Sequence, residues 1–347
     1  MAHEPRLLAL QTAVPAHVLR QDVVADIART LFGGRTNIER MLPVFENSGI
    51  ERRYSCVPPE WYLTEHGWKD RNAIFIENAV ALFERVALAC LSEAGLAPDD
   101  IDAIVSVSTT GIATPSLDAL IVERMHLRRD INRLPIFGFG CAGGVLGLAR
   151  AGALAKASPG TKILLLCVEL CALTFRKNDV SKSNIVATAL FGDGAAGAII
   201  STVGDGPRFG PSGEYTWPSS LGVMGWDIEE DGLKAIFSKS IPTLVEEEFG
   251  TVLLDFLARH ELGLSDIDAF ACHPGGAKVL SALERALRLD EGGLTHSRDV
   301  LRLYGNMSAV TVLFVLERMH IREQHRRTLL STLGPGFTAA FMTLDGR

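Results

Sequence analysis

Apolar residues recur along this chain in two blocks that follow the same order. Residues 80–94 and 252–261 each show the spacing of an amphipathic helix. Related segments then lead into an apolar run typical of a buried strand, over 95–105 in the first block and 263–271 in the second. The pattern therefore predicts a helix followed by a strand in each block.

Both blocks continue alike beyond the strand. Cys141 lies 39 residues after Asp102, and Asn306 lies 38 residues after Asp268. In the first block, a helix pattern over 145–157 is followed by a glycine-rich, strand-like run over 191–200. In the second block, the helix pattern covers 310–319 and the strand-like run covers 334–344. Three echoes in order, at nearly constant spacing, predict an α/β protein built from two βαβ-rich halves.

The duplication makes Cys141 and Asn306 equivalent positions. We divide the chain into an N-terminal half, 1–205, and a C-terminal half, 206–347. If the halves pack face to face, equivalent positions converge near a pseudo-two-fold axis. A thiol and a carboxamide would then point into one space.

Cys141 has the surroundings of a nucleophile. It lies between residues 134–137, which we expect to form a short buried strand, and the helix pattern of 145–157. The positive end of that helix favours a thiolate, and a thiolate is the nucleophilic form of cysteine. Most cysteines are instead small buried side chains, and we expect this of Cys56, Cys90, Cys167, Cys171 and Cys272.

The same turn also matches a dinucleotide-binding fingerprint. Gly138, Gly140 and Gly143 give the G-x-G-x-x-G spacing, and Glu169 ends the next apolar run, where a ribose-binding acid could lie. A lone match of this kind is a weak signal. It leaves the second copy of the pattern unexplained.

His273 adds a third reactive group. It follows the apolar run 269–272 and precedes Pro274-Gly275-Gly276. Glycine-rich turns at strand ends are where α/β sheets place reactive side chains. The alternative is an ordinary loop histidine, and convergence with Cys141 and Asn306 favours the catalytic interpretation.

Bulk properties exclude several classes of protein. The chain has 347 residues, a net charge of −7 and a mean hydropathy of +0.20, which disfavours nucleic-acid binding. No apolar run reaches the length of a membrane span, and the first residues give no signal-peptide pattern. Six scattered cysteines without supported zinc spacing predict reduced thiols, no metal site and a cytoplasmic protein.

Two irregular segments remain. Residues 32–62 carry a basic cluster that is either a solvated face or a landing site for a phosphate carrier, formed by Arg35, Arg40, Arg52 and Arg53. Residues 202–224 are rich in glycine and proline, and we interpret them as the connection between the halves.

The motifs together resemble the thiolase superfamily, and more closely the type III polyketide synthases, which are chalcone-synthase-like. The resemblance rests on five segments in order: FGCAGG around Cys141, LFGDGAA around Phe191, HPGG from His273, GNMS around Asn306, and LGPGF over 333–337. It covers nearly the whole chain and is closest to bacterial alkylpyrone and alkylresorcinol synthases. It implies a thiolase-like fold with duplicated βαβαβ halves in five layers, α-β-α-β-α.

The resemblance also implies a reaction. Cys141 would hold an acyl group from an acyl-CoA starter, and His273 would pair with the thiolate. Asn306 and His273 would stabilise the enolate formed when malonyl-CoA loses carbon dioxide. Repeated condensation and ring closure need coenzyme A thioesters as substrates and no other cofactor.

Further roles follow from the same resemblance. Phe191 would gate the pocket, Ala235 replaces a second gating aromatic residue, and Trp226 would border the cyclisation side. Small residues that border an acyl-tail tunnel in long-chain bacterial members are Thr110, Thr114 and Cys171, so we expect a fatty acyl-CoA starter. Arg40, Arg52 and Arg53 would bind coenzyme A. The family forms homodimers in which residues 109–115 reach the neighbour's cavity.

Two alternatives stay open. A priming ketoacyl synthase would share the cysteine, histidine and asparagine but would take malonyl from a carrier protein and condense once. A non-catalytic thiolase-like subunit would need none of the three residues, and all three are present.

Overall fold

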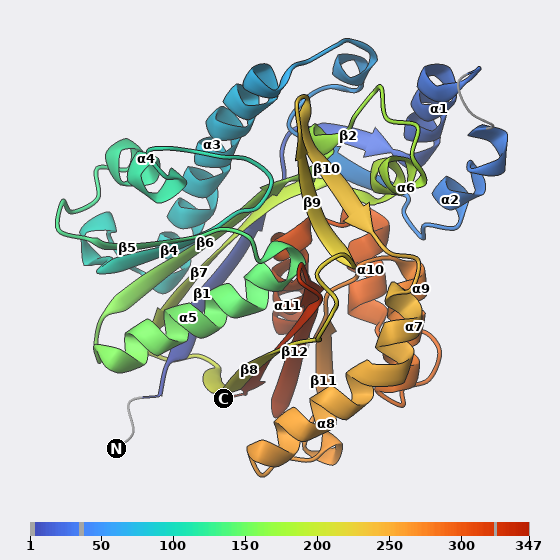
Figure 1. Ribbon diagram of the computed structural model, residues 1–347. Helices are drawn as coiled ribbons and strands as arrows, with labels where there is room; N and C mark the ends of the chain where they lie inside the picture. Colours follow the sequence, from blue (N-terminus) through green and yellow to red (C-terminus); the bar gives the residue numbers. More distant parts are fainter. Residues whose placement is uncertain (1–3, 35–37, 323–324, 347) are drawn as a thin grey trace.

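The chain folds into two half-sheets with helices between them and on both outer sides (Figure 1). The computed structural model describes residues 4–34, 38–322 and 325–346. From one outer side to the other, the layers are helix, sheet, helix, sheet and helix, as the resemblance implies. The predicted α/β fold of duplicated halves is confirmed.

The half-sheet of the N-terminal half has the order β5-β4-β6-β7-β1. Its strands are β1 (Arg6–Ala13), β4 (Ala103–Val107), β5 (Asn132–Ile136), β6 (Lys162–Leu170) and β7 (Asp193–Ser201). β4 is parallel to β5 and β6, whereas β7 is antiparallel to both β6 and β1. The carboxyl ends of β4 and β5 therefore open on the same edge of the sheet.

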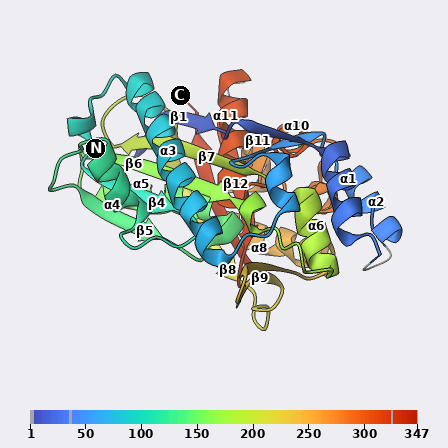
Figure 2. The same ribbon diagram turned by 90° about the horizontal axis from the view of Figure 1, so that it is seen from above.

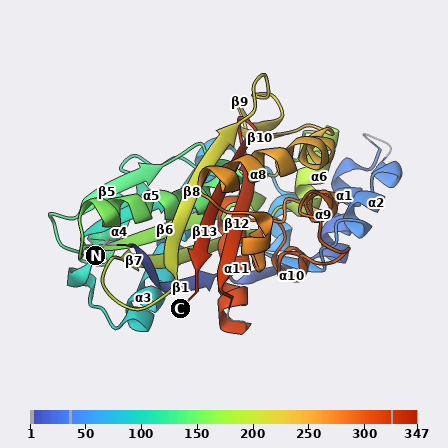
Figure 3. The same cartoon turned by 90° about the horizontal axis from the view of Figure 1, so that it is seen from below.

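The second half-sheet repeats this topology without a counterpart of β5. Its order is β11-β12-β13-β8, formed by β8 (Arg208–Thr216), β11 (Ala269–Cys272), β12 (Arg327–Gly334) and β13 (Thr338–Asp345). Figure 3 shows β8, β13 and β12 side by side. β11 is parallel to β12, and β13 is antiparallel to β12 and β8. The half-sheets join where Arg6 of β1 pairs with Arg208 of β8.

Two helices fill the central layer. α5 (Gly143–Ala157) contacts β4 and β6 of one half-sheet and β12 and β13 of the other, and α11 (Thr311–Arg322) packs beside it. Close approach here requires small residues, because a Cβ atom on Gly144 would lie 2.2 Å from the backbone oxygen of Ala309. The helix starts that carry the catalytic candidates are thereby brought together.

Outer helices cover the remaining faces. α3 (Trp68–Ala94) lies across β1, β6 and β7 (Figure 2), and its apolar side forms one core with those strands. The opposite outer layer packs on β12 and β13 and contains α7 (Ile241–Leu244), α8 (Gly250–Arg259), α9 (Ala277–Ala286) and α10 (Thr295–Tyr304). In the part of the chain that the structure describes, no helix combines the length and apolarity needed to cross a bilayer.

Smaller elements surround the end of the sheet at which β4 and β5 terminate. They are β2 (His17–Arg20), α1 (Gln21–Phe32), α2 (Pro43–Glu46), β3 (Arg52–Ser55), α4 (Leu117–Arg124), α6 (Lys182–Leu190), and the hairpin of β9 (Met224–Glu229) and β10 (Gly232–Phe237). Short helical turns η4 (Gly140–Ala142), η5 (Cys171–Thr174) and η8 (Ser308–Val310) lie at the same edge.

One prediction about local structure is wrong. Residues 134–137 were expected to be buried, but Leu134 and Phe137 are 37% and 60% exposed, because β5 is the edge strand and is covered on one side only. Residues 202–224, which we interpreted as the connection between the halves, also contain β8, the strand of the second half-sheet that is equivalent to β1.

Candidate active site

Cys141 lies in the η4 turn immediately before α5. Its backbone geometry needs the preceding glycine: Gly140 has a φ of 47°, and a Cβ atom there would lie 2.6 Å from Pro335. The Gly140 N–H donates to Thr109 Oγ1 at 3.1 Å, which fixes the turn to the end of β4. The thiol is buried, with 9% of Cys141 exposed.

His273 follows the last residue of β11. Its backbone N–H donates to the Ser331 carbonyl of β12 at 2.9 Å, so the ring continues from a fixed strand end. The residue is 4% exposed, and neither ring nitrogen has a hydrogen-bond partner among the described residues. Two unpaired nitrogens in a buried position suit a bound ligand, which would supply the missing contacts.

Asn306 links the other groups. Its Nδ2 donates to the Gly275 carbonyl in the turn after His273 at 3.3 Å, and its Oδ1 accepts from the Ser308 N–H at 2.8 Å. The Ser308 side chain in turn hydrogen-bonds the thiol of Cys141. Contacts through Ser308 and the turn after His273 therefore bring Cys141, His273 and Asn306 to one buried region.

An apolar wall closes one side of this space. Phe191 ends α6, and its backbone bridges to that of Asn306. Its ring packs against Trp226 of β9 and Phe237 of β10, at centroid distances of 5.9 Å and 5.6 Å. Ala235 of β10 is buried in the same cluster. Phe191, Trp226 and Ala235 thus belong to one apolar cluster.

Comparison with known proteins decides the family. The model for chalcone and stilbene synthases matches in two parts, its N-terminal domain over residues 2–206 and its C-terminal domain over residues 212–345. The chain belongs to the chalcone and stilbene synthase family. As a type III polyketide synthase it is an acyltransferase that performs iterative condensation.

Individual relatives agree with this assignment. A putative chalcone synthase of Bacillus subtilis is 36% identical over 97% of both chains. A 1,3,6,8-tetrahydroxynaphthalene synthase of Streptomyces peucetius is 37% identical over 97% of this chain and 92% of the relative. The crystal structure of the tetrahydroxynaphthalene synthase of Streptomyces coelicolor superposes with a TM-score of 0.94 at 29% identity, covering 99% of each chain.

Membership of this family disfavours the alternatives. A priming ketoacyl synthase is not favoured, and a non-catalytic subunit is inconsistent with an enzyme family. The dinucleotide-binding interpretation is wrong, because Glu169 is fully buried and cannot reach a ribose. Among the described residues, no group of three or more acidic, histidine or cysteine side chains is arranged to hold a metal ion.

The resting charge state differs from the sequence expectation. Burial raises the pKa of the Cys141 thiol to about 12, and the Ser308 hydrogen bond offsets this only in part. Burial also lowers the pKa of His273 to about 3. Loss of solvent therefore outweighs the helix terminus in the unliganded site, and each group taken alone is neutral near pH 7.

A buried carboxyl group beside Cys141 was missed. Glu169 of β6 accepts from the Thr109 N–H at 3.0 Å and from Thr110 Oγ1 at 2.8 Å. Burial raises its pKa to about 7, although these donors and Ser308 favour the charged form. The only sequence signal was an acid ending an apolar run. The raised pKa favours the protonated form of this buried carboxyl group more than in a solvated glutamate.

Replacement of Glu169 by glutamine should flatten the pH dependence of stability. Between its unfolded pKa of 4.5 and its folded pKa of about 7, the folded chain keeps a proton that the unfolded chain has lost. The free energy of unfolding therefore falls as pH rises through this window, by on the order of 3 kcal/mol. Urea denaturation at about pH 5 and about pH 8 measures the change. An equal fall in wild type and Glu169→Gln would contradict the buried proton, and Glu229→Gln on the exposed β9 strand is the control.

The three small residues expected to border an acyl-tail tunnel lie in different surroundings. Cys171 begins η5 and lines an apolar pocket together with Phe191. Thr110 is bound to Glu169 and lines a second, smaller pocket beside the hairpin. Thr114 is exposed and lines neither pocket. Cys171 and Thr110 thus line two different pockets.

The arginines of the basic cluster also differ in how much of each is exposed to solvent. Arg53 was expected to bind coenzyme A, but it is 1% exposed. Its guanidinium donates to Gln21 and to the carbonyls of Thr188 and Ala189 at the end of α6. Burial lowers its pKa to about 10. The expectation is wrong because β3 turns this side chain inward to hold α6.

The other arginines differ in position. Arg52 and Arg40 are exposed and accessible to a phosphate-bearing ligand. Arg35 lies outside the described residues.

Proposed function

We propose that this enzyme joins malonyl-CoA units to a long-chain fatty acyl-CoA starter and releases alkylpyrones or alkylresorcinols. The observation that carries the proposal is an apolar pocket lined by Phe191, whose backbone bridges to that of Asn306. Cys171 and, from α1, Val24 and Ile27 also line it, and its empty space of about 450 Å³ includes open solvent at the mouth. Each methylene buried there contributes about 0.8 kcal/mol to binding.

The chemistry follows from the neutral resting pair. A proton passes from the Cys141 thiol to His273 as the thiolate attacks the acyl-CoA carbonyl, so opposite charges form together and stabilise each other. Coenzyme A leaves with that proton, and the acyl group stays on Cys141. Neutral His273 then has an N–H to donate in the following step.

Extension begins when malonyl-CoA loses carbon dioxide. The electron pair of the broken bond forms an enolate, whose oxygen accepts hydrogen bonds from Asn306 Nδ2 and His273. The enolate carbon attacks the acyl thioester and expels Cys141 as a thiolate. The lengthened chain is now a thioester of coenzyme A and can reload on Cys141.

The names of two relatives suggest a second candidate function. The Streptomyces peucetius protein that is 37% identical is named for 1,3,6,8-tetrahydroxynaphthalene, a product without an alkyl tail. A Mycobacterium tuberculosis relative that is 29% identical is named for α-pyrone synthesis. The second candidate function is therefore tetrahydroxynaphthalene formation, with malonyl-CoA as the only substrate.

A single experiment separates these functions. The purified enzyme is incubated with malonyl-CoA alone and with a series of acyl-CoA starters, and products and protein adducts are identified by mass spectrometry. We expect alkylated products from long starters and an acyl adduct on Cys141. Tetrahydroxynaphthalene from malonyl-CoA alone, with no use of acyl-CoA, would establish the second function. Activity only with a carrier protein would overturn both.

Filling the apolar pocket should change starter preference. Ala187→Phe places a ring between Phe191 and α1, and the ratio of kcat/KM for long over short starters should fall about tenfold for every two methylenes displaced. Ile27→Trp blocks the mouth and should act in the same direction. Thr114→Phe is the discriminating variant, because Thr114 lines neither pocket. A change in Thr114→Phe alone would place the tail on the neighbour-facing route.

We also propose a cytoplasmic homodimer. Ile112, Leu134 and Phe137 are exposed apolar side chains near the free edge of β5, where a second chain could cover them. All six cysteines are free thiols, which supports a reducing compartment. The molar mass of the active species in the same preparation checks the dimer, and an active monomer would contradict it.

A further inference from the structure

The β9–β10 hairpin lies outside the large sheet and packs against Phe191, which lines the apolar pocket. Trp226 and Phe237 of the hairpin pack on Phe191, and Ala235 is buried beside them. The two strands pair only with each other, and β10 contacts α6 and η5. Its position over the reaction space therefore depends on side-chain contacts and not on a sheet ladder.

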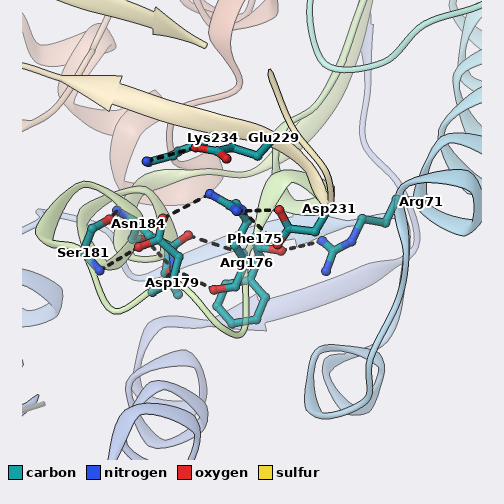
Figure 4. A network of polar contacts seen from close by, with 10 residues as sticks. Arg71, Phe175, Arg176, Asp179, Ser181, Asn184, Glu229, Asp231 and Lys234 are labelled. Atoms are coloured by element: carbon teal, nitrogen blue, oxygen red, sulfur yellow. Dashed lines mark hydrogen bonds and ion pairs between the residues drawn. The ribbon is translucent and has the colours of Figure 1, made fainter. Parts of the chain in front are cut away.

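One ion pair ties the tip of this hairpin to the body of the enzyme. Arg176, just after η5, donates from Nε to Asp231 Oδ2 at 3.0 Å and from Nη2 to Asp231 Oδ1 at 2.5 Å (Figure 4). Asp231 lies in the turn between β9 and β10. The side chain of Arg176 is 14% exposed and that of Asp231 is 43% exposed. A two-pronged contact of this kind fixes orientation as well as distance.

The backbone that carries Arg176 is itself held firmly. Asn184 of α6 donates from Nδ2 to the carbonyls of Arg176 at 2.8 Å and Asp179 at 2.6 Å, and its Oδ1 accepts from the Arg176 N–H at 3.3 Å. Arg71 of α3 donates to the carbonyls of Leu173 and Phe175 (Figure 4). The same held segment starts at Cys171, which lines the apolar pocket.

The Arg176–Asp231 ion pair and the packing of Trp226 and Phe237 on Phe191 together join the hairpin to the segment from Cys171 to Phe191. That segment contributes both Cys171 and Phe191 to the lining of the apolar pocket. We propose that the Arg176–Asp231 ion pair is a positioning device that holds the hairpin against Phe191 and thereby sets the length of polyketide that forms before release. The proposal rests on the condensing activity of the enzyme and not on which starter it uses.

Asp231→Asn tests the proposal with little change in shape. It removes the charge that holds Arg176, so the hairpin should move and the ratio of longer to shorter products should change about tenfold, since a misplacement of about 1 Å in a positioning group can alter rates up to 100-fold. Malonyl decarboxylation should stay within about twofold of wild type, because Cys141, His273 and Asn306 are not on the hairpin. Arg176→Gln should give the same product shift.

A matched control lies on the same hairpin. Lys234 and Glu229 form an ion pair at 3.3 Å that joins β9 to β10 and does not reach α6 (Figure 4). Glu229→Gln should therefore leave the product ratio unchanged. Asp231→Glu keeps the charge and should restore much of the wild-type ratio.

The outcomes separate the possible failures. An unchanged product ratio in both Asp231→Asn and Arg176→Gln, with or without a lower melting temperature, would overturn the proposal and leave a purely structural pair. An equal shift in Glu229→Gln would also overturn it. A wild-type enzyme that makes no polyketide would instead be a failure of the proposed function.

Discussion

Cys141→Ala should reduce polyketide formation by on the order of 10⁵-fold, to the background of the assay. The acyl chain then has no covalent carrier at the position where the enolate attacks. The methyl group of alanine fits the buried turn between Gly140 and Ala142, so the fold should persist. Product formation from acyl-CoA and malonyl-CoA, followed by liquid chromatography, measures the loss.

The same variant should retain slow malonyl decarboxylation. Asn306 and His273 do not depend on the thiol for their positions, because Asn306 is held by Gly275 and Ser308 and His273 by Ser331. Cys90→Ala, in the buried face of α3, is the control and should condense at close to the wild-type rate. Substantial product from Cys141→Ala, or an acyl adduct on another cysteine, would move the nucleophile elsewhere.

Asn306→Ala should lower malonyl decarboxylation by about 100- to 1,000-fold, the usual effect of removing one donor to a developing oxyanion. Asn306 lies just before η8, and its Nδ2 donates to the Gly275 carbonyl in the turn after His273, beside which the thioester oxygen would lie. Release of carbon dioxide from malonyl-CoA without a starter isolates this step from acyl transfer.

Measuring acylation of Cys141 in Asn306 variants distinguishes loss of the hydrogen-bond donor from damage to the fold. Asn306 Oδ1 also accepts from the Ser308 N–H, so alanine removes a structural bond as well. Asn306→Asp keeps that acceptor, removes the donor and adds a negative charge beside the developing enolate. It should therefore show at least the same fall in decarboxylation while Cys141 still takes an acyl group. Wild-type decarboxylation in either variant would remove the proposed role of this amide.

Much of the site could be predicted from sequence because its parts lie at the ends of regular elements. Cys141 precedes a helix, His273 follows a strand and Asn306 precedes the equivalent helix of the second half. Repeated patterns at equal spacing imply equivalent positions in space, so convergence followed without coordinates. Phe191 and Ala235 needed the family resemblance, since nothing in their local pattern distinguishes them from core residues.

Other features could not be predicted, because they depend on which face of an element is covered. Residues 134–137 are apolar, and only their place at the edge of the sheet leaves Leu134 and Phe137 exposed. Arg53 has the chemistry of a phosphate ligand, and only the packing of β3 against α6 makes it a buried support. The Arg176–Asp231 ion pair joins residues 55 apart on elements with no shared pattern.

The amino-acid sequence by itself determined the duplicated α/β halves, the three reactive residues and the family, because all of these are written in local spacing and short motifs. The tertiary structure decided the charge states of Cys141 and His273, the proton held by Glu169 and the position of the hairpin wall. These depend on desolvation and on contacts between distant segments. Such quantities arise only when the chain is folded and water is excluded.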